Sequence, residues 1–265
     1  MTKPDPQISA ETTLVEGFAS AVAADLELFA LLQDREWSAA VIEAARACPI
    51  SEQLGLVPDS PAGIEAMGMF DAALAALPET VDERVVNEMA SDYADVYLRH
   101  FHRASPTESV WMTEDGLERQ EPMFQVQAWY RRNNLRVTDQ AQRPDDHIVF
   151  ELRFLAHLFA EAAKGGPGAA DKLAEAARFL DAHPLRCVGL LAERLMTVGA
   201  SPVFASLSRV TATYLETVRS ALVEIAGVAR PVPELTLEAK RKKAKEKTCA
   251  DPDEKPFIPG IAPSW

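Results

Sequence analysis

Apolar residues recur at every third or fourth position along most of this chain. The pattern is clear near the N-terminus, in Leu14, Phe18, Val22, Leu26, Phe29 and Leu32. Such spacing places the side chains on one face of an α-helix. Similar patterns predict helices over residues 37–48, 64–77, 81–101, 122–133, 144–164, 169–182, 185–198 and 202–225. Residues 110–112 and 135–138 are the best strand candidates, but neither is convincing. The sequence therefore predicts an all-α fold, a single globular domain of about nine to ten helices.

The helical pattern ends near residue 230 and divides the chain into a body and a tail. We expect one helical domain over residues 1–230, with an N-terminal half to about 134 and a C-terminal half from about 144. The loop 135–143 could act as a hinge for a homodimer that exchanges halves, so a monomer and a homodimer both stay open. Residues 231–265 hold a basic run and then a proline-punctuated stretch, which predicts a C-terminal extension.

Charge and cysteine content exclude several classes of protein. The 27 basic and 40 acidic residues leave a formal charge of −13, which argues against a nucleic-acid partner because phosphate must be met by positive surface. The three cysteines are far apart and form no CxxC pair, so we expect neither a disulfide framework nor a zinc ribbon. Acidic residues interrupt the apolar N-terminal stretch, so no export signal or stable membrane insertion is expected. We expect a cytoplasmic protein.

The densest polar cluster comprises Arg143, Pro144, Asp145, Asp146 and His147, and it leads into Glu151. At helical spacing His147 and Glu151 share a face. One interpretation makes Asp146 and His147 a solvent-facing pair that binds a cationic ligand. The other makes them a helix N-cap with a satisfied histidine. His157 lies ten residues from His147 and nearly opposite it on a helix, so we expect no metal site.

No motif for catalysis or nucleotide binding accompanies this cluster. The chain has no GxSxG, GxxxxGK[ST] or GxGxxG segment. His183 precedes Cys187, but the pair flanks a helix start and is interpreted as core. We therefore expect no catalytic residue, no cofactor and no enzymatic activity. Trp111, Trp129 and Tyr130 flank the loops, where aromatic side chains can form a peptide pocket.

Residues 105–158 resemble the central region of the TorD/DmsD family of redox-enzyme maturation chaperones. That family shows a Pro-x-x-Ser-Val stretch, a helix that ends in Tyr-Arg, and a Pro-x-Asp-His motif followed by Glu-Leu-x-Phe-Leu. The corresponding residues here are Pro106, Ser109, Val110, Tyr130, Arg131, Pro144, Asp146, His147, Glu151, Leu152, Phe154 and Leu155. The resemblance extends more weakly over residues 12–225. Arg143 is a departure, because the family commonly has Glu before the proline.

The resemblance implies an all-helical cytoplasmic chaperone without catalytic activity. Such proteins bind the twin-arginine leader or the body of a molybdoenzyme catalytic subunit, assist cofactor insertion and delay export until folding is complete. Carboxylates bind guanidinium groups in bidentate geometry, and aromatic side chains can bind an apolar stretch. We therefore expect the leader to bind at a site that comprises Pro144, Asp145, Asp146, His147, Glu151, Trp111, Trp129, Tyr130 and Tyr97.

Three alternatives stay open at this point. The first is an assembly chaperone of the nitrate-reductase type, which shares the fold but serves a cytoplasmic client without a leader. The second is a metal-dependent helical hydrolase that uses Asp146 and His147. The third is a structural helical adaptor with no preference for leader peptides.

Overall fold

The computed structural model describes residues 6–99, 104–138 and 142–231. Within these residues the chain forms eleven α-helices, one π-helix and no β-strand, so the all-α prediction is confirmed. The count exceeds the predicted nine to ten because α3 (Ile50–Gln53) and α6 (Glu108–Met112) are short helices outside the segments that the sequence predicts as helical. The predicted C-terminal extension lies outside the described residues from residue 232 onward.

The helices follow the sequence pattern closely in the second half of the chain and less closely before it. The first half contains α1 (Pro6–Asp34), α2 (Ala39–Ala47), α3, α4 (Pro61–Ala75), α5 (Glu83–Tyr93) and the π-helix η1 (Ala94–Leu98). The second half contains α6, α7 (Glu121–Arg132), α8 (Ile148–Ala163), α9 (Ala169–Ala182), α10 (Pro184–Thr197) and α11 (Pro202–Ala226). None of the described helices is both long and apolar enough to cross a bilayer.

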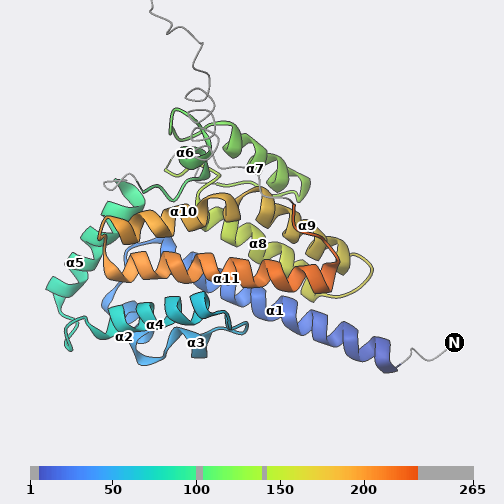
Figure 1. Ribbon diagram of the computed structural model, residues 1–265, viewed down its shortest axis with the longest axis horizontal. Coiled ribbons are helices and arrows are strands. Elements are labelled where there is room, and N and C mark those ends of the chain that lie inside the picture. The colour runs from blue at the N-terminus through green and yellow to red at the C-terminus, as the bar shows by residue number, and fades with distance from the viewer. Residues whose placement is uncertain (1–5, 100–103, 139–141, 232–265) are drawn as a thin grey trace, which may run out of the picture. The chain divides into compact units, whose positions relative to one another are not determined.

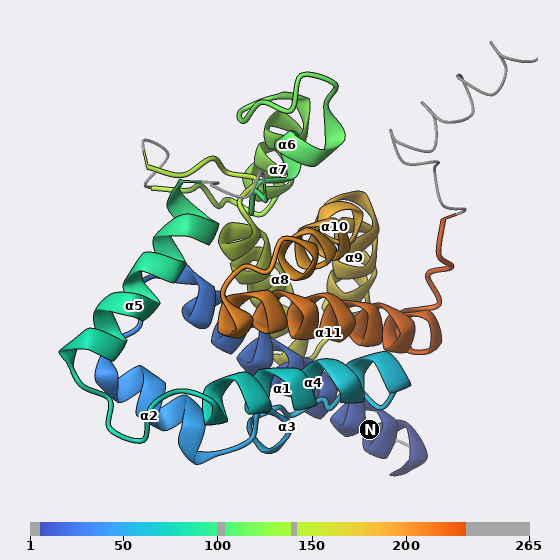
Figure 2. The ribbon, with the colours of Figure 1, turned by 60° about the vertical axis from the view of Figure 1, so that its left-hand side comes forward.

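The long helices α1, α8 and α11 form the centre of the body. Helix α1 lies along α8, and α11 packs against α4 on one side and α10 on the other (Figure 1). Helices α6 and α7 contact each other, and α6 also contacts α10. Together they lie across α8 and α10 from α2, α3 and α4 (Figure 2). This arrangement leaves α6 and α7 as a separate layer over the main bundle.

Large apolar side chains from these helices fill the core. Phe29 of α1 packs against Tyr214 of α11 with ring centroids 4.9 Å apart. The Tyr214 hydroxyl donates to Asp25 at 2.8 Å, and Asp25 also accepts from the backbone N–H groups of Gly55 and Leu56 at 2.8 and 2.9 Å. The buried carboxylate therefore joins α1, α11 and the loop after α3.

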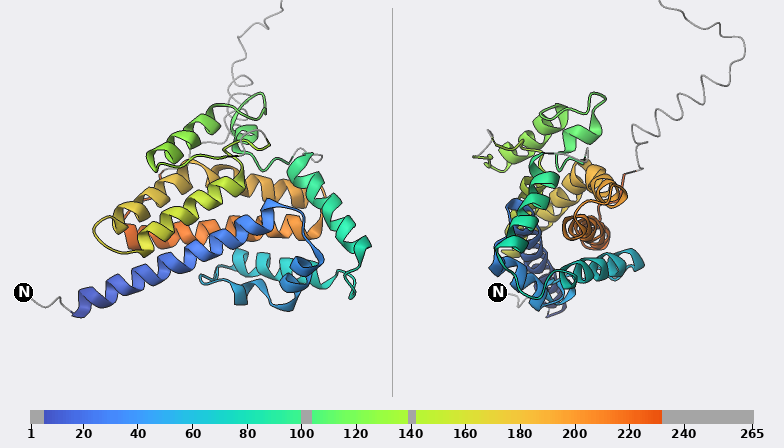
Figure 3. Two further views of the ribbon diagram at one scale, coloured as in Figure 1. Left: turned by 180° about the vertical axis from the view of Figure 1, so that it is seen from behind. Right: turned by 90° about the vertical axis from the view of Figure 1, so that its left-hand side faces the viewer.

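Some residues on the predicted packing faces are exposed. Leu14 is solvent-exposed on α1, the helix that begins nearest the end marked N in Figure 3. Ile64 and Ile225 are also exposed rather than packed. The predicted helix over 81–101 is interrupted, since α5 ends at Tyr93 and continues as η1. The strand candidate 110–112 is part of α6, and 135–138 forms no regular element.

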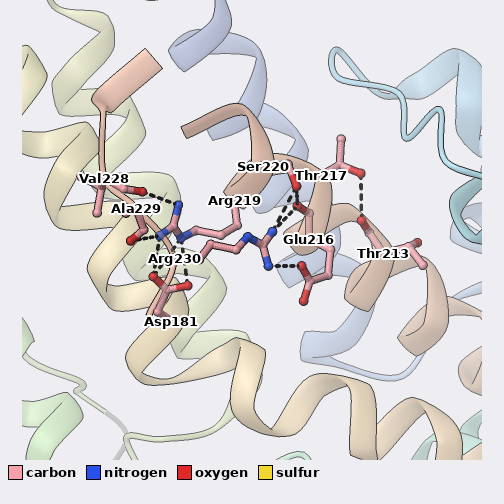
Figure 4. Close-up of polar contacts among 9 residues, drawn as sticks. All are labelled: Asp181, Thr213, Glu216, Thr217, Arg219, Ser220, Val228, Ala229 and Arg230. Carbon is pink, nitrogen blue, oxygen red and sulfur yellow. Dashed lines mark hydrogen bonds and ion pairs between the residues drawn. The ribbon is translucent and has the colours of Figure 1, made fainter. Parts of the chain in front are cut away.

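Arg219 of α11 fixes the path of the chain after that helix. Gly227 ends α11 in the left-handed conformation with φ of 63°, which lets the backbone turn back. The buried Arg219 guanidinium then donates to Val228 O and Ala229 O at 3.0 Å each. It also donates to both carboxylate oxygens of Asp181 in α9 at 2.7–2.9 Å (Figure 4). A buried guanidinium is tolerated here because each of its three nitrogens donates at least one hydrogen bond.

We expect Arg219→Met to lower the free energy of unfolding by about 3–5 kcal/mol, because it leaves the Asp181 carboxylate without its cation. Arg230→Met is the matched control. Arg230 pairs with Glu216 at the surface of the same helix (Figure 4), where a pair contributes less than about 1 kcal/mol. Urea unfolding followed by circular dichroism measures both, and equal losses would contradict this assignment.

Candidate functional site

Two segments that are distant in sequence, 105–109 and 145–148, lie side by side. The backbone N–H of Glu108 donates to Asp146 O at 3.0 Å, and that of Ile148 donates to Pro106 O at 2.8 Å. Thr107 and His147 form an isolated antiparallel bridge between them. The start of α6 is thereby joined to the start of α8. We call this pairing the α6–α8 junction.

Asp146 caps α6 from across the junction. Its carboxylate accepts hydrogen bonds from Ser109 N at 2.8 Å and Ser109 Oγ at 2.5 Å. Thr107, at the N-cap position of α6, makes no side-chain cap hydrogen bond within the described structure. The first N–H groups of a helix lack intrahelical partners, so Asp146 satisfies one of them in place of a local cap. Burial raises the pKa of Asp146, and the hydrogen bonds from Ser109 act in the opposite direction.

His147 is the N-cap of α8, and its Nδ1 accepts from the backbone N–H of Val149 at 3.2 Å. Asp146 and His147 are both buried, so the interpretation of a solvent-facing pair is wrong. The helix-cap interpretation is confirmed for His147. The physical reason is the α6–α8 junction. Residues 105–109 cover both side chains, and this segment is too far away in the sequence to be detected from local spacing.

The neighbouring residues of the predicted site are also part of the packing. Pro144, Asp145 and Tyr130 are buried. The Tyr130 hydroxyl donates to Asp145 O at 3.0 Å, and Gln127 Nε2 donates to Asp145 Oδ2 at 3.1 Å. These contacts join α7 to the loop before α8.

The remaining aromatic residues surround the junction on other sides. Tyr97 of η1 is buried, lies 6.5 Å from His147 between ring centroids, and donates to Gln33 Oε1 at 3.2 Å. Trp111 and Trp129 are half-buried. Trp111 Nε1 donates to Ser105 O at 2.7 Å, and Trp129 packs edge-on against Phe179 at 5.6 Å. The structure thus gathers the predicted residues around one region, but mostly beneath the surface.

Beside the junction lies the buried carboxylate cluster, which we define as Glu108, Glu151 and His183. His183 Nδ1 lies 2.8 Å from Glu108 Oε2, and the half-exposed Arg186 lies 3.0 Å from Glu108 Oε1. Burial, followed by the charges of Glu108 and Asp146, raises the pKa of Glu151 well above its usual value. The sequence predicted a role for Glu151 and a core position for His183, but it gave no reason to single out Glu108. His183 and Glu108 are 75 positions apart, so no local spacing connects them.

Arg143, the departure from the family motif, anchors the segment before α8 to the end of α1. Its guanidinium donates to Asp34 Oδ1 at 2.6 Å, to the Asp34 carbonyl and to the Tyr93 hydroxyl at 2.9 Å. Arg153 of α8 donates to Asp34 Oδ2 at 3.0 Å. Burial alone would raise the pKa of Asp34, but the hydrogen bonds of Arg35 and Arg143 and the charge of Arg153 outweigh it and lower the pKa. The predicted hinge, 135–143, is thus attached at Arg143, and 139–141 lie outside the described residues.

A cavity of about 280 Å³ opens between the end of α7 and α8. Tyr130, Phe150 and Phe154 contribute to an apolar lining, and Arg136, Arg153 and His157 also line it. Of the nine residues predicted to bind peptide, Tyr130 reaches this cavity. Its cationic groups disfavour the guanidinium groups of a leader at this place.

Comparison with known proteins finds that this chain is similar to proteins named as chaperones. The sequence model of the family described as nitrate reductase delta subunit matches residues 65–193. The chain is 34% identical over 94 residues to chaperone protein TorD of Vibrio vulnificus, covering 35% of this chain and 43% of that protein. It is 28% identical over 156 residues to chaperone protein TorD of a Vibrio cholerae serotype O1 strain, covering 58% of this chain and 70% of that protein.

The chain is similar to the TorD/DmsD family of redox-enzyme maturation chaperones, in the region where the motif residues predict the resemblance. It spans less than half the length of the Vibrio vulnificus relative, 43%. Both relatives are named as chaperones.

We expect Asp146→Ala to lower the free energy of unfolding by about 2–3 kcal/mol, because it leaves the buried Ser109 N–H and hydroxyl without their charged acceptor. Asp82→Ala is the matched control. Asp82 is a local, exposed cap of α5 that accepts from Val85 N at 3.0 Å, and losing such a cap costs about 1 kcal/mol. Thermal and urea unfolding compare the two. An Asp146 variant as stable as the Asp82 variant would contradict the remote cap.

We expect Asp34→Asn to destabilise the protein at neutral pH by about 1 kcal/mol, allowing for partial screening by solvent. Because the folded-state pKa of Asp34 is lowered from 3.8, its stabilising contribution exists above that pH and is lost as the pH falls through the folded-state pKa. Unfolding free energies of the wild type and the variant should therefore converge on acidification. A difference that persists undiminished below the folded-state pKa, which itself lies under 3.8, would show that the charge of Asp34 is not responsible.

Proposed function

We propose that this chain is a cytoplasmic chaperone for the catalytic subunit of a molybdenum-containing oxidoreductase. In this role it binds the leader peptide or the body of that subunit, assists cofactor insertion, and delays twin-arginine export until folding is complete. The observation that carries the proposal is the α6–α8 junction, in which the two motif segments of the TorD/DmsD family pair directly. The names of the Vibrio relatives support it.

A leader cannot contact buried carboxylates without opening the fold, so the proposed contact surface lies above them. We define the α6–α7 surface as residues 111–124. Within 113–121 there are four acidic residues and one basic residue. Leu117 and Phe124 are 57% and 52% exposed, and Trp111 is half-buried beside them in sequence.

This composition is complementary to a twin-arginine leader. The leader presents two guanidinium groups and then an apolar stretch. Acidic side chains can bind the guanidinium groups in bidentate geometry, and exposed apolar side chains can cover the stretch that follows. A single exposed apolar residue is ordinary on a protein surface. The proposal therefore rests on the combination of acidic and apolar residues in one short segment.

The nine predicted residues then act mainly by positioning this surface. Asp146 holds the first turn of α6 through Ser109, and Tyr130 holds α7 against the loop that contains Asp145. Trp111 and Trp129, which are half-buried, remain candidates for direct contact with the peptide. Loss of Asp146 should consequently weaken leader binding through disorder of α6 and in parallel with a loss of stability.

We expect Phe124→Ser to weaken leader binding at least about tenfold, the loss of one buried aromatic contact, while the melting temperature stays near that of the wild type. Ile64→Ser is the matched control, because Ile64 is similarly exposed at 59% but lies on α4, across the bundle from α7 (Figure 2). The measurement is calorimetric titration with the leader of the molybdoenzyme subunit that co-purifies from the host.

Replacing both leader arginines by lysine should also weaken binding, since lysine cannot form the bidentate contact. Equal affinity of the two peptides would count against the guanidinium contact. Equal weakening by the Phe124 and Ile64 variants would place the apolar contact elsewhere.

A second candidate is favoured by the description of the matching family, nitrate reductase delta subunit. It is an assembly chaperone that binds the body of a cytoplasmic client without a leader. Titration with the mature client and with its leader as separate ligands distinguishes the two. Tight binding of the mature subunit alone would favour this second candidate.

A further inference from the structure

The buried carboxylate cluster combines residues from three separate parts of the fold. Glu108 begins α6, Glu151 lies in the first turn of α8, and His183 separates α9 from α10. All three are buried, and one potential ligand atom from each lies within 4.8 Å of the other two. The group therefore has the geometry of a small coordination site.

Glu151 is the second, independent observation. Its side chain is completely buried, and neither of its carboxylate oxygens has a hydrogen-bond partner among the described residues. The carboxylate is aimed at Glu108 and His183, since its ligand atom lies within the same 4.8 Å. Buried polar groups are normally hydrogen-bonded because an unpaired one is costly.

The surroundings hold more acid than base. The charges of the buried Glu108 and Asp146 raise the pKa of Glu151, and the charge of Arg186 acts in the opposite direction. Arg186 is already engaged with Glu108 Oε1 at 3.0 Å. A buried excess of carboxylates is stabilised either by protonation or by a bound cation.

We infer that Glu108, Glu151 and His183 bind one divalent first-row metal ion such as Zn²⁺. Two carboxylate oxygens and one imidazole nitrogen are ligands that zinc accepts in proteins. Ligand atoms about 2.0–2.2 Å from an ion lie about 3.4 Å apart in tetrahedral geometry. The observed 2.8 Å between His183 Nδ1 and Glu108 Oε2 requires these two ligand atoms to move slightly apart.

The ion would tie α6, α8 and the start of α10 together beneath the α6–α7 surface. Its role is structural and independent of the proposed chaperone function. Leader binding and metal binding are measured separately, so failure of one leaves the other standing.

The first test uses the full chain without a tag, stripped of metal by a chelator and then titrated with Zn²⁺. We expect one ion to bind per chain. The melting temperature should rise by about 5–10 °C at a hundredfold excess over the dissociation constant, and the rise should be reversed by the chelator. Glu151→Gln keeps the shape of the side chain and should abolish both effects. Glu161→Gln, on the same helix but paired with Lys164 at the surface, should leave them unchanged.

The second test does not depend on the folding of any variant. X-ray absorption at the zinc edge of the loaded wild type should show one imidazole together with oxygen ligands. The inference is overturned if the stripped chain binds no Zn²⁺ and Glu151 simply retains a proton. It is also overturned if Glu151→Gln binds as the wild type does, or if the spectrum shows two or more imidazoles.

Discussion

Asp146 accepts two hydrogen bonds from Ser109, and the layer formed by α6 and α7 depends on this contact. Helix α6 has only five residues, too few to be stable on its own. It persists because the α6–α8 junction supplies its cap from the segment before α8. The same segment accepts the Tyr130 hydroxyl at Asp145 O, which attaches α7. One short backbone pairing thus positions the whole surface that we propose for the leader.

The cost of this arrangement is a core that contains several carboxyl groups. Glu108, Asp146 and Glu151 are all fully buried. If packing were the only requirement, apolar residues at these three positions would give a more stable protein. Asp146 is explained by its cap, and Glu108 by His183 and Arg186. Neither carboxyl oxygen of Glu151 has a hydrogen-bond partner in the described structure. Buried ionisable groups of this kind are found preferentially at functional sites.

Most of the helices could be predicted from the sequence because helical periodicity is a local property. The sequence predicted the bounds of α9, α10 and α11 to within one residue. It placed the start of α8 four residues too early, at 144 instead of Ile148, although it allowed for His147 as a helix cap. It failed where the outcome depends on distant contacts. Asp146 looks exposed from its polar neighbours but is covered by residues 105–109. Glu108 carried no local signal, because its partner His183 is far away in the chain. Leu14 fits the helical pattern, yet it is exposed to solvent.

The π-helix η1 contains one residue more in its turn than an α-helix would, and the positions of the side chains after it depend on that extra residue. The Arg99 N–H donates to Ala94 O, five residues earlier, at 2.8 Å, whereas an α-helix would use a carbonyl four residues earlier. Each helical residue turns the chain by about 100°. A relative with one residue fewer in this turn would therefore rotate the position of Tyr97 away from Gln33 and His147. An insertion or deletion at η1 should therefore disturb the core packing around Tyr97 more than a substitution in the same turn.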